Sequence, residues 1–433
     1  MIDIQFIRDN AELVAEKSKQ KGYNVDISAL LAQDEQRRKL LTQVEALRQQ
    51  RNVLSNANKG EKPTAAQINS GKAIKEKLSL LEIELETIDA DYYKLLRQVP
   101  NIPTASVPVG SSEDENVVIG TIGAPTKFDF EPKSHAEIGE TKGWIDRDRA
   151  AKIAGSRFVY LKGSIVQLQF AIIQWVMSVL TDEEILKTII EANNLKVSAK
   201  AFEPVLPPAI VKTDAYKATG RLNEDEVTYK LAGDDEQWLN ASAEHSLCNM
   251  YMDEILPADT LPRRYIGYAT SFRREAGTYG KDMEGIIRLH QFDKLEMEVF
   301  SSPETGEEEH KFLIAIQAYL VGKLGLPYRL LQKCTFDIGF PNASGWDVEV
   351  WVPSQNKYRE THSADFMTDY QARALKTRVK NDDGNIVFAH TNDATAFALG
   401  RIIAFIIENY QTSDGNVRIP EVLKTYMGGR EIL

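Results

Sequence analysis

The chain has 433 residues, 43% hydrophobic and 27% charged, which is the composition of an ordinary soluble protein with room for two or three domains. Its net charge of −11 argues against nucleic-acid binding over the whole surface and confines any such site to a local patch. Two cysteines, no apolar run of the roughly 18 to 20 residues that a membrane span needs, and an N-terminus unlike a signal or transit peptide predict a cytoplasmic protein.

Apolar residues recur with strict heptad spacing near the end of the first hundred residues. A weaker series of the same kind, from Leu40 to Leu54, precedes it, and residues 56–71 between them carry the turn formers Gly60, Pro63 and Gly71. The spacing predicts a coiled coil, folded back as an antiparallel hairpin in which a helix of about 28 residues would project about 40 Å. The stronger series is Ile74, Leu78, Leu81, Leu85, Ile88, Tyr92 and Leu95.

The same hairpin is basic. From Arg37 to Lys77 there are ten Lys or Arg residues against three Asp or Glu, a local excess of +7. A solvated helix face without a partner is one interpretation. A long basic rod also suits the phosphate backbone of RNA, which is recognised mainly by charge and shape. The cations expected to contact RNA are Arg37, Arg38, Lys39, Arg48, Arg51, Lys72 and Lys75.

Residues 98–125, rich in Pro, Gly, Ser and Val, are expected to be a linker that ends the hairpin. Beyond it, residues 163–180 and 310–324 are expected to be helical. Strand-like runs at 265–273, 286–300, 328–339, 347–353 and 386–390 follow one another without regular alternation with helices. This order predicts an α+β domain with a mainly antiparallel sheet flanked by helices. No GxxxxGK[ST] motif occurs, so a P-loop is excluded.

The segment 271–297 combines two strand-like runs with a charged loop. Arg273, Arg274 and Glu275 end the first run, and Gly277 and Gly280 punctuate the loop. Arginines on one strand can grip a phosphate and the loop can fold over it, which is the pattern of a nucleotide clamp. A solvated, charged edge hairpin is the alternative interpretation.

The run 394–407 is apolar on all sides and is expected to be a buried helix. Its only charged residue is Arg401. A buried guanidinium needs an anionic partner, so Arg401 is expected to pair with a buried carboxylate or to bind a phosphate. The preceding Gly400 would let a ligand or a backbone segment approach closely.

Four stretches together carry a family resemblance that covers essentially the whole chain in order. FRREAGTYG…RLHQFDKLEM resembles motif 2 of the class II aminoacyl-tRNA synthetases in its seryl form, and ALGRIIAFIIENYQ resembles motif 3. KIAGSRFVYLKGSIVQLQFAIIQWVM followed by VLPP is similar to the dimer-forming motif 1 region. GNVRIPEVLKTYMGG is similar to the C-terminal tail of seryl-tRNA synthetases, and the helical hairpin to their tRNA-binding domain.

The resemblance implies a tRNA-binding domain at 1–105 and a class II catalytic domain at 106–433. It implies a homodimeric ligase that activates L-serine with ATP to seryl-adenylate and transfers the seryl group to the 3′ end of tRNA(Ser). Whether tRNA(Sec) is a second partner is left open, and neither a membrane nor DNA is expected as one. The little covalent chemistry left to the protein would rest on positioning and charge stabilisation.

By the same resemblance, Arg273 would hold the α-phosphate and the serine carboxylate, Glu275 would contact the adenine, and Arg401 would contact the γ-phosphate. Arg273 and Arg401 are thus the implied catalytic residues. Glu360 and Ser363 would hold Mg²⁺ together with ATP, although on the sequence alone Glu360 would be a surface residue. The implied ATP-binding residues are Arg273, Arg274, Glu275, Glu360, Thr361, His362, Ser363 and Arg401.

The implied amino-acid pocket departs from the family pattern at several positions. Ser242 stands for a usual Thr, Asp393 for a usual Asn, and Ala394 for a usual Gly; His362 replaces a usual Ser, and Asp365-Phe366 a usual Ser-Asn pair. These changes put details of the pocket in doubt more than they threaten ATP binding, and His362 is also compatible with a structural role. The implied serine-binding residues are Ser242, Ala243, Glu244, Arg273, Glu296, Asp393 and Thr395.

Two alternatives remain beside an active ligase. A catalytically altered paralogue would act as an RNA-binding or regulatory protein, and it predicts decay of the residues that grip ATP. A ligase that charges a carrier protein would be expected to have a truncated hairpin. The ATP-gripping residues are all present and the hairpin is long and basic, so the sequence favours the serine–tRNA ligase.

Overall fold

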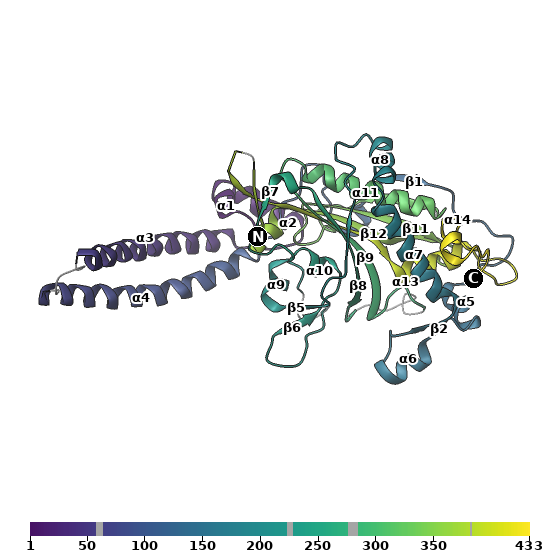
Figure 1. Cartoon of the computed structure of the whole chain (residues 1–433), viewed down its shortest axis with the longest axis horizontal. Coiled ribbons are helices and arrows are strands. Elements are labelled where there is room, and N and C mark those ends of the chain that lie inside the picture. Colours follow the sequence, from purple (N-terminus) through teal and green to yellow (C-terminus); the bar gives the residue numbers. More distant parts are fainter. Residues whose placement is uncertain (58–63, 223–227, 276–284, 382) are drawn as a thin grey trace. The chain divides into compact units, whose positions relative to one another are not determined.

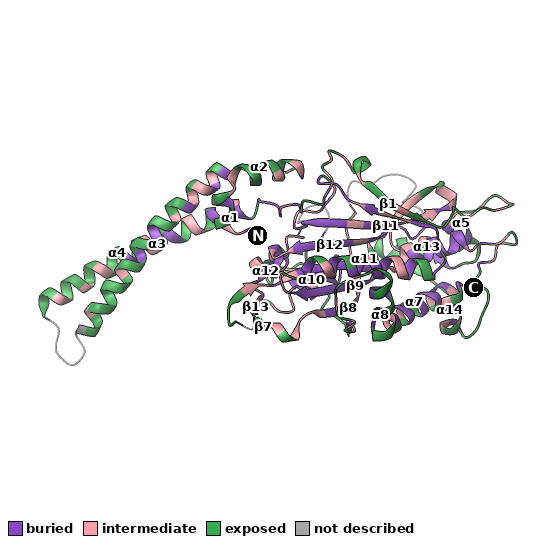
Figure 2. Ribbon diagram, turned by 90° about the horizontal axis from the view of Figure 1, so that it is seen from above, coloured by how far each residue is buried: buried purple, intermediate pink, exposed green. Residues whose placement is uncertain are grey.

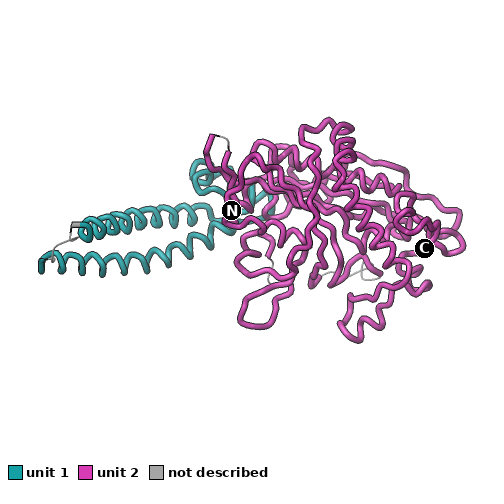
Figure 3. The backbone as a smooth tube through the Cα atoms, viewed as in Figure 1, with its two compact units in different colours: residues 1–102 teal, residues 103–433 magenta. Residues whose placement is uncertain are grey.

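The computed structural model describes residues 1–57, 64–222, 228–275, 285–381 and 383–433 (Figure 1). The chain forms two compact units, Met1–Ile102 and Pro103–Leu433 (Figure 3). The sequence placed this division after residue 105. Gly60, Pro63, Gly277 and Gly280, to which the sequence assigned turns, lie outside the described residues.

The first unit is helical, with α1 (Ile4–Asp9), α2 (Ala11–Gln20), α3 (Ile27–Ala57) and α4 (Ala65–Leu96). Helices α3 and α4 pack side by side as the expected hairpin (Figure 2). Two ion pairs join the antiparallel helices, Arg37 Nε to Asp89 Oδ1 at 2.5 Å and Arg48 Nη2 to Glu82 Oε1 at 2.7 Å. The seam between them buries Leu40, Val44, Leu78 and Leu85.

The turn of the hairpin is shorter than expected. Helix α4 begins at Ala65, where Thr64 and Gln67 form a reciprocal capping box. Gly71, which we expected in the turn, therefore lies inside α4. It lies close to Leu54 of α3, but a Cβ built on Gly71 would meet Leu54 Cδ2 at 3.4 Å, an ordinary contact distance, so the packing does not require glycine there.

The second unit is built on an eight-stranded sheet with the order β1-β10-β11-β12-β15-β9-β8-β4. Every neighbouring pair is antiparallel except β4–β8, which confirms the predicted fold class. The strands are β1 (Val117–Ile122), β4 (Glu203–Val205), β8 (Arg263–Phe272), β9 (Gln291–Ser301), β10 (Tyr328–Gln332), β11 (Ser344–Val352), β12 (Lys357–Thr368) and β15 (His390–Ala398).

Shorter strands form three small sheets beside it. They are β2 (Ile145–Asp146) with β3 (Tyr160–Leu161), β5 (Ile210–Lys212) with β6 (Gln237–Leu239), and β7 (Ile255–Pro257) with β13 (Arg378–Lys380) and β14 (Ile386–Phe388). The helices of the unit are α5 (His135–Thr141), α6 (Arg147–Ala154), α7 (Ser164–Leu180), α8 (Glu183–Ala192), α9 (Thr213–Ala218), α10 (Glu244–Leu247), α11 (Gly306–Lys323), α12 (Tyr370–Leu375), α13 (Leu399–Asn409) and α14 (Glu421–Lys424).

One large core joins α7, α11 and α13 to the sheet. Helix α11 lies against β9, β12 and β15. It meets small residues there, because Ala364, Ala394 and Ala396 are fully buried in the same core as Leu313 and Ile316 of α11. Since side chains alternate along a strand, the neighbours of these alanines lie on the opposite face of the sheet, which carries the pocket described below.

Four sequence-based assignments in this unit were wrong. Residues 333–339, expected in a strand, follow β10, which ends at Gln332. Residues 117–122, expected in a linker, form the edge strand β1 paired with β10. Residues 394–398, expected in the last helix, end β15, and α13 begins only at Leu399. An apolar run of this kind is equally compatible with a buried strand and a buried helix, so composition could not locate the boundary. Residues 286–290, expected in a strand, precede β9.

Within the described part of the chain, no single helix is long and apolar enough to cross a membrane. By length and composition only α7 and α8 taken together pass that test, as a pair bent by 75°.

Candidate active site

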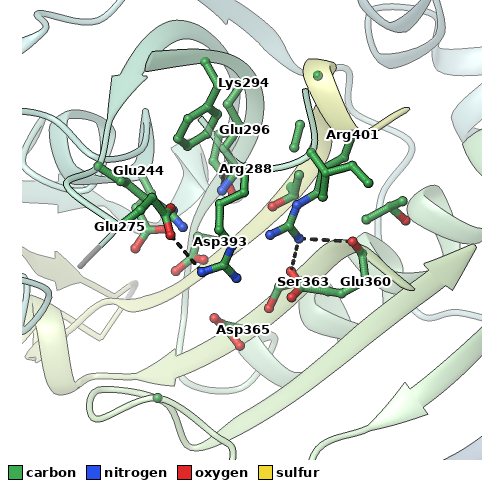
Figure 4. Close-up of a pocket in the computed structure, with 18 of the residues that line it drawn as sticks. Glu244, Glu275, Arg288, Lys294, Glu296, Glu360, Ser363, Asp365, Asp393 and Arg401 are labelled. Carbon is green, nitrogen blue, oxygen red and sulfur yellow. Dashed lines mark hydrogen bonds and ion pairs between the residues drawn. The ribbon is translucent and has the colours of Figure 1, made fainter. Parts of the chain in front are cut away.

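A polar cavity of about 500 Å³ opens on the sheet face opposite α11. Strands β9, β12 and β15, the residues just after β8 and the first turn of α13 contribute to its walls. Figure 4 shows Glu244 and Asp393 on one side of this pocket and Arg401, Glu360 and Ser363 on the other. Ten residues expected in the site line it: Glu244, Arg273, Glu275, Glu296, Glu360, Thr361, Ser363, Asp393, Thr395 and Arg401.

Arg273 and Glu275 directly follow β8. The Arg273 side chain donates from Nε to the carbonyl oxygen of Ala241 at 3.0 Å, and its guanidinium lies 5.4 Å from the Phe292 ring centre. Glu275 accepts a hydrogen bond from Arg288 Nη1 at 2.8 Å. These contacts fix one cation and one carboxylate on the same wall. The adjacent Arg274 is exposed and does not line the pocket.

The sequence had suggested that Arg401 is enclosed by the core. In the structure it lies in the pocket. Its side chain is 23% exposed and pairs with Glu360 Oε1 at 3.2 Å, and its Nη1 donates to the Glu360 carbonyl oxygen at 3.0 Å. Of the two predicted alternatives, the buried ion pair holds only in part, and phosphate binding stays a prediction. Arg401 does have a carboxylate partner, but that partner is a 48% exposed wall residue, and the guanidinium remains accessible to a ligand.

A β-bulge in β12 decides which of its side chains enter the pocket. The pairing with β11 shifts register between Val348 and Glu349, so Thr361 is an extra residue in β12. Glu360 and Ser363 can then share one face, whereas His362 is fully buried with its ring 4.9 Å from that of Phe397. Burial lowers the pKa of His362 to about 3. His362, expected to contact ATP, does not line the pocket.

The acidic end of the pocket, defined here as Glu244, Glu296 and Asp393, gathers three buried carboxylates. An oxygen of each lies within 4.8 Å of an oxygen of the others. Ser242 donates to Glu296 Oε2 at 3.1 Å and accepts from Lys294 Nζ at 3.2 Å, and Lys294 forms an ion pair with Glu296. Ser242 and its neighbour Ala243, both fully buried and absent from the wall, lie behind the carboxylates.

The three carboxylates of the acidic end differ in the direction in which their pKa values are shifted. Burial and the neighbouring Glu244 raise the pKa of Asp393 well above its usual value, although Arg221 opposes the shift. Burial also raises the pKa of Glu296. For Glu244, burial alone would raise the pKa, but Arg221 and the other neighbouring cations outweigh it and hold the pKa below its usual value. An additional positive charge at this end would therefore be favoured.

Several wall residues were missed from the sequence. Lys333 donates from Nζ to Ser363 Oγ at 2.9 Å and pairs with Asp347 and Asp365 at 3.3 and 3.2 Å. Arg288 and Lys294 lie inside the motif that carries Glu296, and Asp365 was named as a departure in the pocket, but none of the three was given a role. Period-two spacing links Lys294 to Glu296 and Asp365 to Ser363. Arg221, Lys333 and Asp337 come from segments that no motif covers. The charged wall residues left out of the predicted site are Arg221, Arg288, Lys294, Lys333, Asp337 and Asp365.

Glu360 and Ser363 could hold a metal ion. They offer carboxylate and hydroxyl oxygens on one wall, the ligand type that Mg²⁺ prefers. The Glu360 carboxylate is half-exposed and so remains open to a further cation beside Arg401, while Lys333 already donates to Ser363. This donor set fits a metal ion that arrives with the phosphates of a nucleotide.

The basic residues of the α3–α4 hairpin fall into two groups. Five of the expected RNA contacts are engaged in ion pairs within the first unit: Arg37, Arg38, Arg48, Lys39 and Lys72. Arg51 and Lys75 are exposed and form no ion pair with any residue that the structure describes. The two unpaired cations are thus available to a phosphate without loss of an internal partner.

Comparison with known proteins agrees with this architecture. The model of the "Seryl-tRNA synthetase N-terminal domain" matches residues 1–103, and that of the "tRNA synthetase class II core domain (G, H, P, S and T)" matches residues 228–410. Serine–tRNA ligase of Desulfitobacterium hafniense (strain DSM 10664 / DCB-2) is 39% identical over 434 residues, which are 99% of each chain. That of Pseudomonas fluorescens (strain Pf0-1) is 37% identical over 441 residues, which cover both chains completely.

Solved structures give the same answer. Seryl-tRNA synthetase from Pyrococcus horikoshii, complexed with ATP, has a TM-score of 0.85 and 34% identity, with 100% of this chain and 99% of that chain covered. Cytoplasmic serine–tRNA ligase from Naegleria fowleri, in complex with AMP, has a TM-score of 0.81 and 26% identity, with 100% and 98% covered. The chain therefore belongs to the seryl-tRNA synthetase family of class II aminoacyl-tRNA synthetases.

Proposed function

We propose that this chain is a serine–tRNA ligase, which activates L-serine with ATP and transfers the seryl group to the 3′ end of tRNA(Ser). The observation that carries the proposal is that one pocket holds Arg273, Glu275, Glu360 and Arg401 together with three buried carboxylates. Cations suit the phosphates of ATP, and the carboxylates suit an ammonium group. The relatives that match at 37 to 39% identity over their full length are named serine–tRNA ligase.

In the first step, the serine carboxylate attacks the α-phosphate of ATP and pyrophosphate leaves. Arg273 holds the reacting carboxylate and phosphate together, and its bond to the Ala241 carbonyl restricts its rotation. Arg401 binds the γ-phosphate from the other wall and stabilises the charge that develops on the leaving group. Glu275, held by Arg288, contacts the adenine.

The acidic end receives the ammonium of serine. Glu244 and Glu296 accept its hydrogen bonds, and Thr395, which lines the same wall, contacts the substrate hydroxyl. Asp393 adds a carboxylate where the family usually has an amide. Ser242 acts from behind by orienting Glu296. The ammonium also offsets the mutual repulsion of the three carboxylates.

Mg²⁺ bound with ATP would be held by Glu360 and Ser363, and it would supply neutralisation of the phosphate charge. Lys333, which lies beside Ser363, adds a permanent positive charge to the same wall. Arg401 and Lys333 offer two cations to the triphosphate, while their carboxylate partners Glu360, Asp347 and Asp365 leave room for the charge of a metal ion.

The α3–α4 hairpin binds tRNA through its exposed cations, with Arg51 and Lys75 as the accessible pair.

We further propose a cytoplasmic homodimer. Edge strand β1 supports dimerisation, because Val117, Val118, Ile119 and Ile122 are 41 to 53% exposed on an open sheet edge that a second copy could cover. Sedimentation of the pure protein measures the oligomeric state. Charging assays with tRNA(Ser) and tRNA(Sec) decide whether the second tRNA is a substrate.

Serine-dependent pyrophosphate exchange without tRNA tests the activation step directly. We expect exchange with serine and only weak exchange with threonine, alanine and cysteine. Its absence in pure, folded protein would contradict the ligase and favour the RNA-binding paralogue. Deletion of residues 36–77 should leave exchange intact and abolish charging of tRNA, whereas efficient charging by the truncated protein would contradict the role given to the hairpin.

A further inference from the structure

Arg221 lies in the wall of the pocket, in a segment to which no motif assigns a role. It follows α9, and the turn before it is well anchored. Its backbone N–H donates to Thr219 Oγ1 at 3.1 Å, and the carbonyl of Thr219 accepts from Gln371 Nε2 at 3.2 Å. The position of the Arg221 backbone is therefore fixed by the surrounding structure.

The Arg221 guanidinium bridges three carboxylates from three different elements. Its Nε lies 2.8 Å from Glu244 Oε1, at the start of α10. Its Nη2 donates to Asp365 Oδ2 in β12 and to Asp393 Oδ2 in β15, each at 3.2 Å. Asp365 and Asp393 are opposite each other in the ladder between the two strands. Arg221 thus fills the space between the acidic end and the neighbouring Asp365.

The guanidinium of Arg221 faces the pocket, although all three of its carboxylate partners are buried. Arg221 is 19% exposed, while the carboxylates it contacts are 6 to 9% exposed, so the guanidinium is the more accessible member of the cluster. Two of its three partners, Glu244 and Asp393, belong to the acidic end. Replacement of Arg221 by a short neutral side chain must therefore alter both the volume and the charge that an amino acid meets.

We infer that Arg221 determines the amino-acid specificity of this site: it holds Glu244 and Asp393 in place for the substrate ammonium and occupies the space that a longer side chain would need. The inference rests on the proposed function and deepens it. It assigns to this pocket small α-amino acids with a neutral side chain, because the guanidinium both limits the length of the side chain and repels a cationic one.

Shortening Arg221 should have two separable consequences. Glu244 and Asp393 lose their shared positioning partner, which weakens the binding of serine. The vacated space is bordered by Asp365 and Asp393, so a cation of suitable size should enter it. The cationic side chain of ornithine, or a free guanidinium ion, is such a cation.

The test uses the full-length protein and amino-acid-dependent pyrophosphate exchange. For Arg221→Ala, we expect the KM for serine to rise by at least about tenfold while the KM for ATP changes little. Exchange with ornithine should appear, and millimolar guanidine hydrochloride should restore the use of serine. Arg221→Gln should show the rise in the KM for serine without the gain of ornithine, because its side chain still fills part of the space.

Arg147→Gln is the matched control, since Arg147 pairs with Glu140 on the surface of the same unit and outside the pocket. Its kinetics should equal those of the wild type. If Arg221→Ala does not fold, Arg221→Gln together with Arg221→Lys carries the test, and the lysine variant should recover part of the serine affinity because it keeps the charge.

Folded Arg221 variants with an unchanged KM for serine and an unchanged amino-acid preference would overturn the inference. Equal increases in the KM for serine and the KM for ATP would overturn it as well, because they would indicate a structural role. A wild-type protein without serine-dependent exchange would instead contradict the proposed function. The two failures are thus distinguishable.

Discussion

Gly400 packs directly against the carbonyl oxygen of Ile286: a Cβ built on Gly400 would lie 2.7 Å from that oxygen. Gly400 precedes Arg401 in the first turn of α13, and Ile286 is among the first described residues after 276–284. Both residues line the pocket. The close approach therefore couples the position of Arg401 to the segment that leads into β9.

Gly400→Ala should displace one of these two backbones, because the atom that it would meet belongs to the main chain. We expect a destabilisation of about 1–3 kcal/mol and a raised KM for ATP in the exchange assay. Gly322→Ala is the control, since Gly322 lies in α11 and its nearest neighbours are 3.8 Å away. An alanine variant at position 400 with unaltered ATP kinetics would show that the contact does not position Arg401.

Arg401→Ala should reduce serine-dependent exchange by about 10²- to 10³-fold, because it removes a cation that acts on the triphosphate. The cost in folding stability should stay below about 1 kcal/mol, since its partner Glu360 is half-exposed and can be solvated. Binding of tRNA, measured by filter retention, should not change. Unchanged exchange would mean that Arg401 serves only as the partner of Glu360.

Asp393→Asn should stabilise the protein, and more so at higher pH. The pKa of Asp393 is raised in the folded protein by burial and by Glu244, so the folded state holds its proton at pH values where the unfolded chain has released it. The free energy of unfolding should therefore fall as the pH rises from the ordinary carboxyl value of about 4 towards the raised one.

The asparagine variant lacks this titration, so its advantage in urea unfolding should be larger at about pH 8 than at about pH 5. Asp259→Asn changes an exposed aspartate of the same unit and serves as the control. A constant difference between Asp393→Asn and the wild type across this range would contradict the raised pKa.

Arg51→Ala combined with Lys75→Ala should weaken tRNA charging and leave exchange untouched, because both cations are exposed on the hairpin and outside the pocket. The plot of log affinity for tRNA against log salt concentration should become shallower, its slope losing about 1 to 2 in magnitude. Arg37→Ala should act differently. Arg37 is paired with Asp89 and lies over the Tyr92 ring at 4.9 Å, so its loss should lower the stability of the hairpin itself.

Much of this architecture was predictable, and the errors have physical causes. The heptad series from Ile74 to Leu95 predicted the hairpin, because a long periodic seam has few alternative structures. The boundary between β15 and α13 was not predictable, since residues 394–407 are apolar throughout and a buried strand has no polar face to mark it.

Some residues of the candidate site were likewise predictable from the sequence and others were not. Arg273, Glu275 and Arg401 lie within extended motifs and were identified, as was Glu296. Arg221 and Lys333 were missed because their partners, such as Asp365, come from other segments that only the sheet brings together. His362 was placed in the pocket by the family resemblance. A β-bulge of one residue, which cannot be read from the sequence, turns its side chain to the other face.

The alternation along β15 has a consequence for how this protein can change over time. Asp393 and Ala394 are adjacent in the chain, yet Asp393 lines the pocket and Ala394 is fully buried in the core with α11. Substitutions at the pocket positions of β9, β12 and β15 can therefore alter substrate preference while the intervening core positions keep the fold intact. We expect tolerance to mutation to oscillate with a period of two residues along these strands. The pocket can thus accumulate departures such as Asp365 and Asp393 in a chain whose framework remains that of its family.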